Sequence, residues 1–164
     1  MKKILFTSII LFFSCYATYA QGNQSRREQR QARTVEVQRM IEMQDYKFVA
    51  QRTNPMQGRS ISLTSAYDLR VGNDTISAYL PYFGRAYIAP MDPLDGGIKF
   101  ESSDFTYQLE QARRGGWITK ITIRDARHRI DMVLQISTNG SASLSVNDVT
   151  RQPITFSGII GRRK

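Results

Sequence analysis

The chain has 164 residues, of which 41% are hydrophobic and 23% charged, and its formal net charge is +9. This length suits one domain and leaves too little chain for two, and the composition is ordinary for a globular protein. The excess of basic residues favours anionic partners or surfaces, although net charge does not indicate a fold.

The first 20 residues have the pattern of a secretory signal peptide. Lys2 and Lys3 form a positive start, residues 4–13 form an apolar run, and Thr18 and Ala20 place small residues where a signal peptidase cuts. The apolar run is about half as long as the roughly 20 residues that a membrane-spanning helix needs. We therefore expect residues 1–20 to be a signal peptide, and the protein to be periplasmic or secreted and not transmembrane.

A lipid anchor at Cys15 is the alternative interpretation of this segment. Ser14 and Cys15 stand where a lipoprotein signal is cut, and an acyl chain on Cys15 would make the protein a membrane-anchored lipoprotein. Cleavage after Ala20 instead removes two lysines and the only cysteine, which leaves 144 residues with a charge of +7. Such a chain has no disulfide, no thiol nucleophile and no thiolate metal site.

Residues 21–45 form an Arg/Gln-rich segment that we predict to be helical from about residue 25 to 44. Ser25 and Glu28 have the spacing of a capping box, in which both side chains satisfy backbone donors at a helix start. Apolar residues recur at helical spacings: Ala32, Val35 or Val37, Met40, Ile41 and Phe48. Like charges crowd the first turns, at Arg26, Arg27, Arg30 and Arg33. Because like charges at these spacings destabilise a helix, we expect the C-terminal half to be the part that docks.

Residues 46–164 show the alternation of apolar and polar residues that is typical of antiparallel sheet with one solvated face. The alternating runs are 61–71, 76–82, 117–123, 130–136, 142–147 and 154–160. Turn-forming residues separate them, with Asn139-Gly140 the strongest hairpin signal. We predict an α+β, mainly β fold, in which the amphipathic helix packs on an antiparallel up-and-down sheet. This sheet has about eight strands and is sandwich-like or a partly closed barrel.

No catalytic arrangement is recognisable in the sequence. His128 is the only histidine and lies in a predicted hairpin loop, without a nucleophile or an orienting partner in a known pattern. One histidine cannot supply a zinc site, and no motif indicates a cofactor or another metal. The alternative is a hydrolase of envelope carbohydrate or peptide that uses two facing carboxylates, drawn from Asp68, Asp104 and Asp131.

Basic residues are predicted to gather at one end of the sheet. In an up-and-down meander every second turn lies at the same end, and these turns carry Arg52, Arg59, Arg127, His128, Arg129 and Arg151. Arginine forks suit phosphate and carboxylate groups, so an anionic ligand is the functional hypothesis for these loops. Nucleic acid is disfavoured as a partner, because export separates the protein from it.

The segment after residue 78 is unusually aromatic, and we take seven of its residues as ligand-binding candidates. They are Tyr79, Pro81, Tyr82, Phe83, Gly84, Arg85 and Tyr87. Pro81 cannot donate to a sheet ladder, and Gly84 permits a bend, so the segment belongs at an edge or bulge. Its rings cannot all face one side, so we expect some aromatic surface to be exposed or to meet the helix.

Motifs in this segment and later resemble an uncharacterised family. YLPYFGRAY is followed by an Ala-Pro pair, by a Gly-Gly-Ile-x-Phe stretch, and by ISTNGSASLSV over residues 136–146. Over roughly residues 30–160 these motifs resemble the exported Gram-negative proteins of domain-of-unknown-function family 4251. The resemblance implies a small exported β-rich domain and carries no established activity, so it transfers no catalytic residue.

These observations favour a non-catalytic binding or envelope-associated protein. Its partner would be a protein, a glycan or an anionic component of the envelope, recognised by the aromatic segment or by the basic loops.

Overall fold

The computed structural model describes residues 25–87, 96–113, 115–125 and 129–163. Within these ranges one helix, over residues 25–42, precedes nine strands. The strands are β1 (Tyr46–Pro55), β2 (Ile61–Val71), β3 (Ile76–Leu80), β4 (Ile98–Ser102), β5 (Phe105–Gln111), β6 (Trp117–Arg124), β7 (Arg129–Ile136), β8 (Ser141–Asp148) and β9 (Ile154–Arg162). The predicted signal peptide and Cys15 lie outside the described residues. No helix in the described part is long and apolar enough to cross a membrane.

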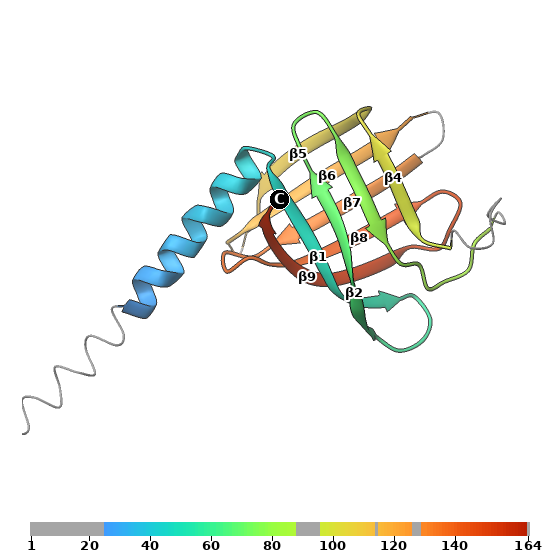
Figure 1. Cartoon of the computed structure of the whole chain (residues 1–164), viewed down its shortest axis with the longest axis horizontal. Helices are drawn as coiled ribbons and strands as arrows, with labels where there is room; N and C mark the ends of the chain where they lie inside the picture. The colour runs from blue at the N-terminus through green and yellow to red at the C-terminus, as the bar shows by residue number, and fades with distance from the viewer. Residues whose placement is uncertain (1–24, 88–95, 114, 126–128, 164) are drawn as a thin grey trace, which may run out of the picture.

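The strands form one antiparallel sheet in the order β4-β3-β2-β1-β9-β8-β7-β6-β5. The first strand, β1, pairs with the last, β9, along its whole length. The two open edges, β4 and β5, are consecutive in the chain and are separated only by residues 103–104. The chain therefore turns a corner from one edge of the sheet to the other, and the sheet is nearly closed, like a barrel (Figure 1). The predicted up-and-down sheet under one helix is confirmed, with nine strands instead of about eight.

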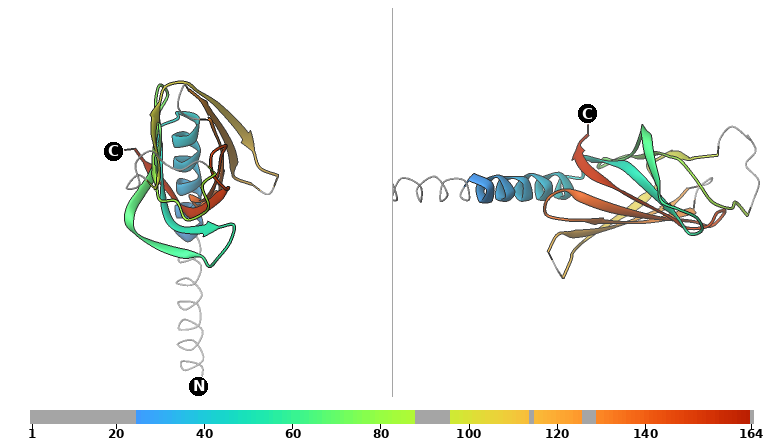
Figure 2. Two further views of the ribbon diagram at one scale, coloured as in Figure 1. Left: turned by 90° about the vertical axis from the view of Figure 1, so that its right-hand side faces the viewer. Right: turned by 90° about the horizontal axis from the view of Figure 1, so that it is seen from below.

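The core lies between the layer formed by β1–β4 and the layer formed by β5–β9 (Figure 2). Strands β7 and β8 bury every second residue, as their alternation predicts. The largest fully buried side chains include Tyr46, Phe48 and Phe156. The single alternating face predicted for residues 61–71 is wrong in its first half, where Ile61 is 39% exposed. The reason is a register shift: Ala50 pairs with Tyr67 but Arg52 pairs with Ser62, so residues 63–66 have no partner in β1 and the alternation is interrupted there.

The helix docks through its C-terminal half at one end of the barrel, as predicted (Figure 1). Val37, Met40 and Ile41 are buried there, whereas Val35 is 65% exposed, so Val37 is the residue that belongs to the apolar face. Every described residue from 25 to 32 is exposed. Ser25 is the first described residue and is already helical, so the predicted capping of the helix start by Ser25 and Glu28 stays a prediction.

A Schellman motif ends the helix and directs the chain into β1. The amide of Asp45 donates to the carbonyl of Met40 (3.0 Å), and the amide of Gln44 donates to the carbonyl of Ile41 (3.1 Å). Gln44 has the left-handed conformation, with φ at 47°, that this motif requires. Because β1 begins one residue later, the cap fixes the helix against the end of the barrel.

Two tyrosines join the end of the helix to both layers of the sheet. The Tyr46 and Tyr107 hydroxyl oxygens lie 3.4 Å apart, and Tyr107 donates to the carbonyl of Ile41 (3.1 Å). Burial raises the pKa of Tyr46 well above its ordinary value, and burial also raises the pKa of Tyr107. Above about pH 10 the unfolded chain therefore releases protons that the folded protein keeps, and stability falls as the pH rises.

We expect Tyr46→Phe to make this alkaline loss of stability shallower. Removing one buried hydroxyl removes up to about 1.4 kcal/mol per pH unit from the slope of the unfolding free energy above about pH 10. Urea unfolding of both proteins at a series of alkaline pH values measures the slope. Equal slopes for the two proteins would show that Tyr46 ionises as readily in the folded state as in the unfolded chain.

Candidate functional site

The candidate residues from the sequence lie mostly at the end of the barrel away from the helix. The β1–β2 hairpin and the β8–β9 loop emerge at this end, and β3 ends and β7 begins there (Figures 1 and 2). Of the six basic-loop candidates, Arg52, Arg59, Arg129 and Arg151 are described, whereas Arg127 and His128 lie outside the described residues.

The aromatic segment owes its shape to Tyr82 and Gly84. Tyr82 is half-buried, and its hydroxyl lies 2.8 Å from the carbonyl of Arg85 and 3.1 Å from the carbonyl of Gln152, to which it donates. A Cβ on Gly84 would lie 2.7 Å from the same hydroxyl oxygen. Glycine at this position therefore leaves room for the Tyr82 ring to pack against the backbone of residue 84. Burial raises the pKa of Tyr82, which keeps the hydroxyl in its donating form. Tyr82 and Gly84 are therefore structural residues, and so is the buried Pro81.

The β8–β9 loop holds the aromatic segment from the other side. The amide of Tyr87 donates to Thr150 (2.8 Å), and the amide of Gln152 donates to Arg85 (3.1 Å). Arg151 donates to the carbonyl of Gly97 (2.6 Å) and lies 5.3 Å from the Tyr82 ring centre. Asp148 forms a 3.7 Å ion pair with Arg151. We call these contacts of Tyr82, Asp148 and Arg151 the frame of the aromatic segment. Arg151 thus fastens three parts of the chain together, and it does not offer a free guanidinium to a ligand.

Four side chains of the aromatic segment are exposed. Phe83 is 39% exposed and Tyr87 is 66% exposed, and the Arg85 side chain reaches solvent beside them. Tyr79 is also exposed, but it stacks on Tyr67, which packs against the core, with ring centres 5.5 Å apart. The rings of this segment therefore do not meet the helix. Tyr82 is half-buried, Tyr79 is stacked on Tyr67, and Phe83 and Tyr87 are exposed.

Phe83, Gly84 and Arg85 line a cleft of about 310 Å³ together with the β1–β2 hairpin. The hairpin contributes Pro55, Gln57, Gly58, Arg59 and Ile61, and the β8–β9 loop contributes Gln152. We call this the loop-end cleft. The cleft brings together the basic-loop candidate Arg59 and the aromatic-segment candidates Phe83, Gly84 and Arg85, which are more than 20 residues apart in the sequence. They meet because the β1–β2 hairpin and the chain after β3 lie at the same end of the barrel.

The loop-end cleft is basic and partly apolar. Arg59 and Arg85 line it, and none of the described lining residues is acidic. Within the described ranges neither guanidinium has a hydrogen bond or ion pair. Ile61 and Phe83 supply exposed apolar surface at the same place. Such a surface suits a ligand that carries a carboxylate or another anion on an apolar-faced body.

Arg52 and Arg129 are exposed but do not line the cleft.

The carboxylates proposed for a hydrolase are partly engaged elsewhere, since Asp68 pairs with Arg70 (3.0 Å) and Asp131 pairs with Arg124 (3.4 Å). In the described part of the chain, no three His, Cys, Asp or Glu side chains gather where they could hold a metal ion.

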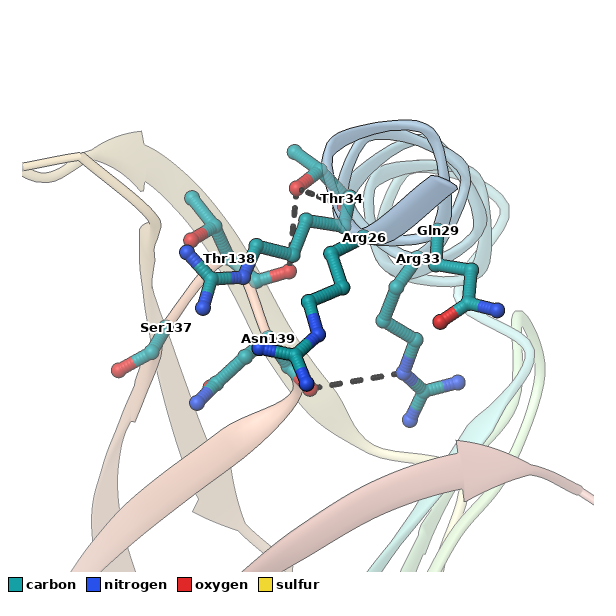
Figure 3. Close-up of a pocket in the computed structure, with 8 residues that line it drawn as sticks. Arg26, Gln29, Arg33, Thr34, Ser137, Thr138 and Asn139 are labelled. Carbon is teal, nitrogen blue, oxygen red and sulfur yellow. Dashed lines mark hydrogen bonds between the residues drawn. The ribbon is translucent and has the colours of Figure 1, made fainter. Parts of the chain in front are cut away.

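A second basic cavity was missed by the sequence analysis. It measures about 540 Å³ and lies between the helix and the β7–β8 turn, where Arg26, Arg30 and Arg33 face Ser137, Thr138 and Asn139 (Figure 3). We call it the helix–hairpin pocket. The available signal was the arginine repeat of the helix, which the sequence analysis treated only as a source of instability.

Comparison with known proteins supports the fold. Residues 28–160 match the family model described as Domain of unknown function (DUF4251). The crystal structure of a DUF4251 family protein from Bacteroides eggerthii is similar, with a TM-score of 0.59 and 12% sequence identity. The similarity covers 80% of this chain and 88% of that chain, and at this identity it shows the fold alone. No curated protein matches the chain.

Proposed function

We propose that this chain, which belongs to the DUF4251 family, is a non-catalytic, envelope-associated binding protein that holds an acidic glycan in the loop-end cleft. The observation that carries the proposal is the combination of Arg59 and Arg85 with the exposed ring of Phe83, in a cleft that no carboxylate from the described ranges lines. Arginine forks bind sugar carboxylates through paired hydrogen bonds, and an aromatic ring packs on the apolar face of a sugar.

The size of the cleft favours a glycan over a folded protein. Its volume of about 310 Å³ is at the lower end of the range for small-ligand sites and has room for a sugar unit. A stable protein partner buries about 800 Å² on each side, which requires a much larger surface. The signal-peptide pattern of residues 1–20 supports an exported protein, and acidic polysaccharides are accessible outside the cytoplasm.

The frame around the cleft supports binding by a preformed site. Tyr82, Arg151 and Asp148 fix the chain on either side of Phe83 and Arg85 through buried or half-buried contacts. A ligand therefore does not have to order the loop that recognises it, and less conformational entropy is lost on binding.

We expect Arg59→Ala/Arg85→Ala to weaken binding of oligogalacturonate by at least about tenfold, because each guanidinium contributes charged hydrogen bonds. Titration calorimetry with the purified protein measures the affinity, and a neutral glucan of equal length provides the reference ligand. Phe83→Ala should weaken binding as well, because the sugar then loses its apolar contact.

Arg52→Ala/Arg129→Ala is the matched control, since it removes the same charge at the same end of the barrel without touching the cleft. Its affinity for oligogalacturonate should stay within about twofold of the unmodified protein. Equal losses in both double variants would mean diffuse charge attraction, and tight binding of the neutral glucan would mean that the arginines are not the recognition element. Either result would overturn the proposal.

A further inference from the structure

The helix–hairpin pocket brings side chains together from two ends of the chain. The helix supplies Arg26, Arg30 and Arg33, and the β7–β8 turn supplies Ser137, Thr138 and Asn139. Figure 3 shows Arg26 and Arg33 extending from the helix toward the turn that carries Thr138 and Asn139. None of the lining residues that the structure describes is an aspartate or glutamate, so these walls consist of cations and neutral hydrogen-bonding groups.

Direct contacts hold the two walls in place. Arg33 donates to the carbonyl of Ile160 (3.0 Å) and to that of Asn139 (3.5 Å). The Thr34 hydroxyl lies 2.9 Å from the carbonyl of Arg30 in its own helix and 3.3 Å from the carbonyl of Thr138 in the turn. A Cβ on Gly140 would lie 2.8 Å from the Arg33 guanidinium, so the turn needs glycine here to accept the arginine.

Arg33 is also paired with Glu36 at 3.0 Å, and the Arg33 guanidinium lowers the pKa of that carboxyl. The contacts of Arg33 join the helix to the hairpin. This arginine therefore forms part of the pocket wall, and its guanidinium is not free to bind an anion.

The guanidinium groups of Arg26 and Arg30, in contrast, have no hydrogen-bond or ion-pair partner within the described ranges, although the backbone carbonyl of Arg30 accepts from Thr34 (2.9 Å). They are four residues apart and so lie on one face of the helix, together with Arg33. Like charges at this spacing destabilise a helix, and no described acid in the pocket offsets their repulsion. A bound anion would remove this repulsion.

We infer that the helix–hairpin pocket is a second binding site, for a ligand that carries a phosphomonoester group. A phosphomonoester carries close to two negative charges and three terminal oxygens, which match two free guanidinium forks and the Ser137 and Thr138 hydroxyls. The pocket volume of about 540 Å³ exceeds what a bare phosphate fills, so the group belongs to a larger body, either a soluble sugar phosphate or a lipid headgroup. This site lies on the helix side of the barrel and is independent of the loop-end cleft.

The test uses the purified protein and two sources of the same group. Glucose 6-phosphate is titrated by nuclear magnetic resonance of the arginine side-chain Nε–H signals, and binding to phosphatidic acid vesicles is measured by co-sedimentation. Vesicles of phosphatidylglycerol, a phosphodiester, are adjusted to equal surface charge. We expect Arg26→Ala/Arg30→Ala to weaken binding by at least about tenfold, with the fold unchanged because both side chains are exposed.

Arg27→Ala/Arg39→Ala is the control, because it removes two arginines from the same helix that do not line the pocket. Binding of glucose 6-phosphate that only Arg26→Ala/Arg30→Ala weakens supports the site with a soluble ligand. The same dependence for phosphatidic acid vesicles alone supports it with a lipid headgroup. Binding to neither source, equal binding to both vesicle types, or equal losses in the two variants would overturn the inference. Neither result depends on Arg59 or Arg85, so the two proposed sites can fail separately.

Discussion

Replacing Gly158 with alanine is expected to lower the free energy of unfolding by about 3 kcal/mol. Gly158 lies in β9 and is paired with Ala50 of β1 and with Ala142 of β8. A Cβ at this position would overlap the carbonyl oxygen of Val49 and would lie 2.9 Å from the carbonyl carbon. Both obstacles are backbone atoms, so β1 and β9 have to move apart. The pairing of β1 with β9 joins β1–β4 to β5–β9 in the middle of the sheet, so its disruption would divide the sheet in two.

Gly161→Ala is the matched control for this prediction. Gly161 lies in the same strand, three residues further on, and an added Cβ there meets nothing within 4 Å. Its free energy of unfolding should change by no more than about 0.5 kcal/mol. Urea unfolding followed by circular dichroism measures both variants. A similar stability for Gly158→Ala and Gly161→Ala would show that β1 and β9 do not approach as closely as the structure indicates.

The sequence predicted those strands whose two faces differ most. Residues 130–136 and 142–147 alternate strictly, and both became strands with one buried and one exposed face. The residues of β4 and β5 were not predicted as alternating runs. β4 has only five residues, and β5 is an edge strand in which no residue is fully buried, so the contrast between its faces is weak. The same two strands form the corner that closes the sheet, which explains why barrel closure could not be read from periodicity.

The candidate site was only partly predictable, because contacts across the chain decide its form. The aromatic segment was recognised as unusual, but the role of Tyr82 depends on Gln152, which is 70 residues away in the sequence. Gly84 is explained by the same ring and not by the general freedom of glycine. No local pattern distinguishes Tyr82, which fastens the segment, from Phe83, which is free to contact a ligand.

The helix–hairpin pocket illustrates the same limit more strongly. The four arginines of the helix are visible in the sequence, and their mutual repulsion is a local effect. The β7–β8 turn faces these arginines, and its Asn139, which contacts Arg33, is 106 residues away in the sequence. This turn contributes the neutral hydrogen-bonding groups of the proposed anion site. Helical periodicity predicted which half of the helix docks, but the partner of the other half follows only from the folded barrel.

Replacing Ile41 with alanine is expected to lower the free energy of unfolding by about 3 kcal/mol, because the side chain is fully buried and the vacated space cannot be refilled. Ile41 is the residue at which helix, β1 and β5 meet, since its carbonyl accepts from Tyr107 and Tyr107 contacts Tyr46. The substitution therefore weakens the attachment of the helix as well as the core. Trp117, the only tryptophan, packs against the core and reports unfolding by its fluorescence.

Val35→Ala provides the comparison, because Val35 is 65% exposed on the same helix. Alanine is a better helix former than valine by a few tenths of a kcal/mol, so this variant should be as stable as the unmodified protein or slightly more so. A loss for Ile41→Ala as small as the change for Val35→Ala would mean that the helix is an appendage and not a part of the core. In that case the helix would not be a fixed wall of the helix–hairpin pocket. The Ile41→Ala and Val35→Ala proteins should then bind glucose 6-phosphate with equal affinity. If the helix is integral, partial detachment by Ile41→Ala should weaken both the fold and that binding.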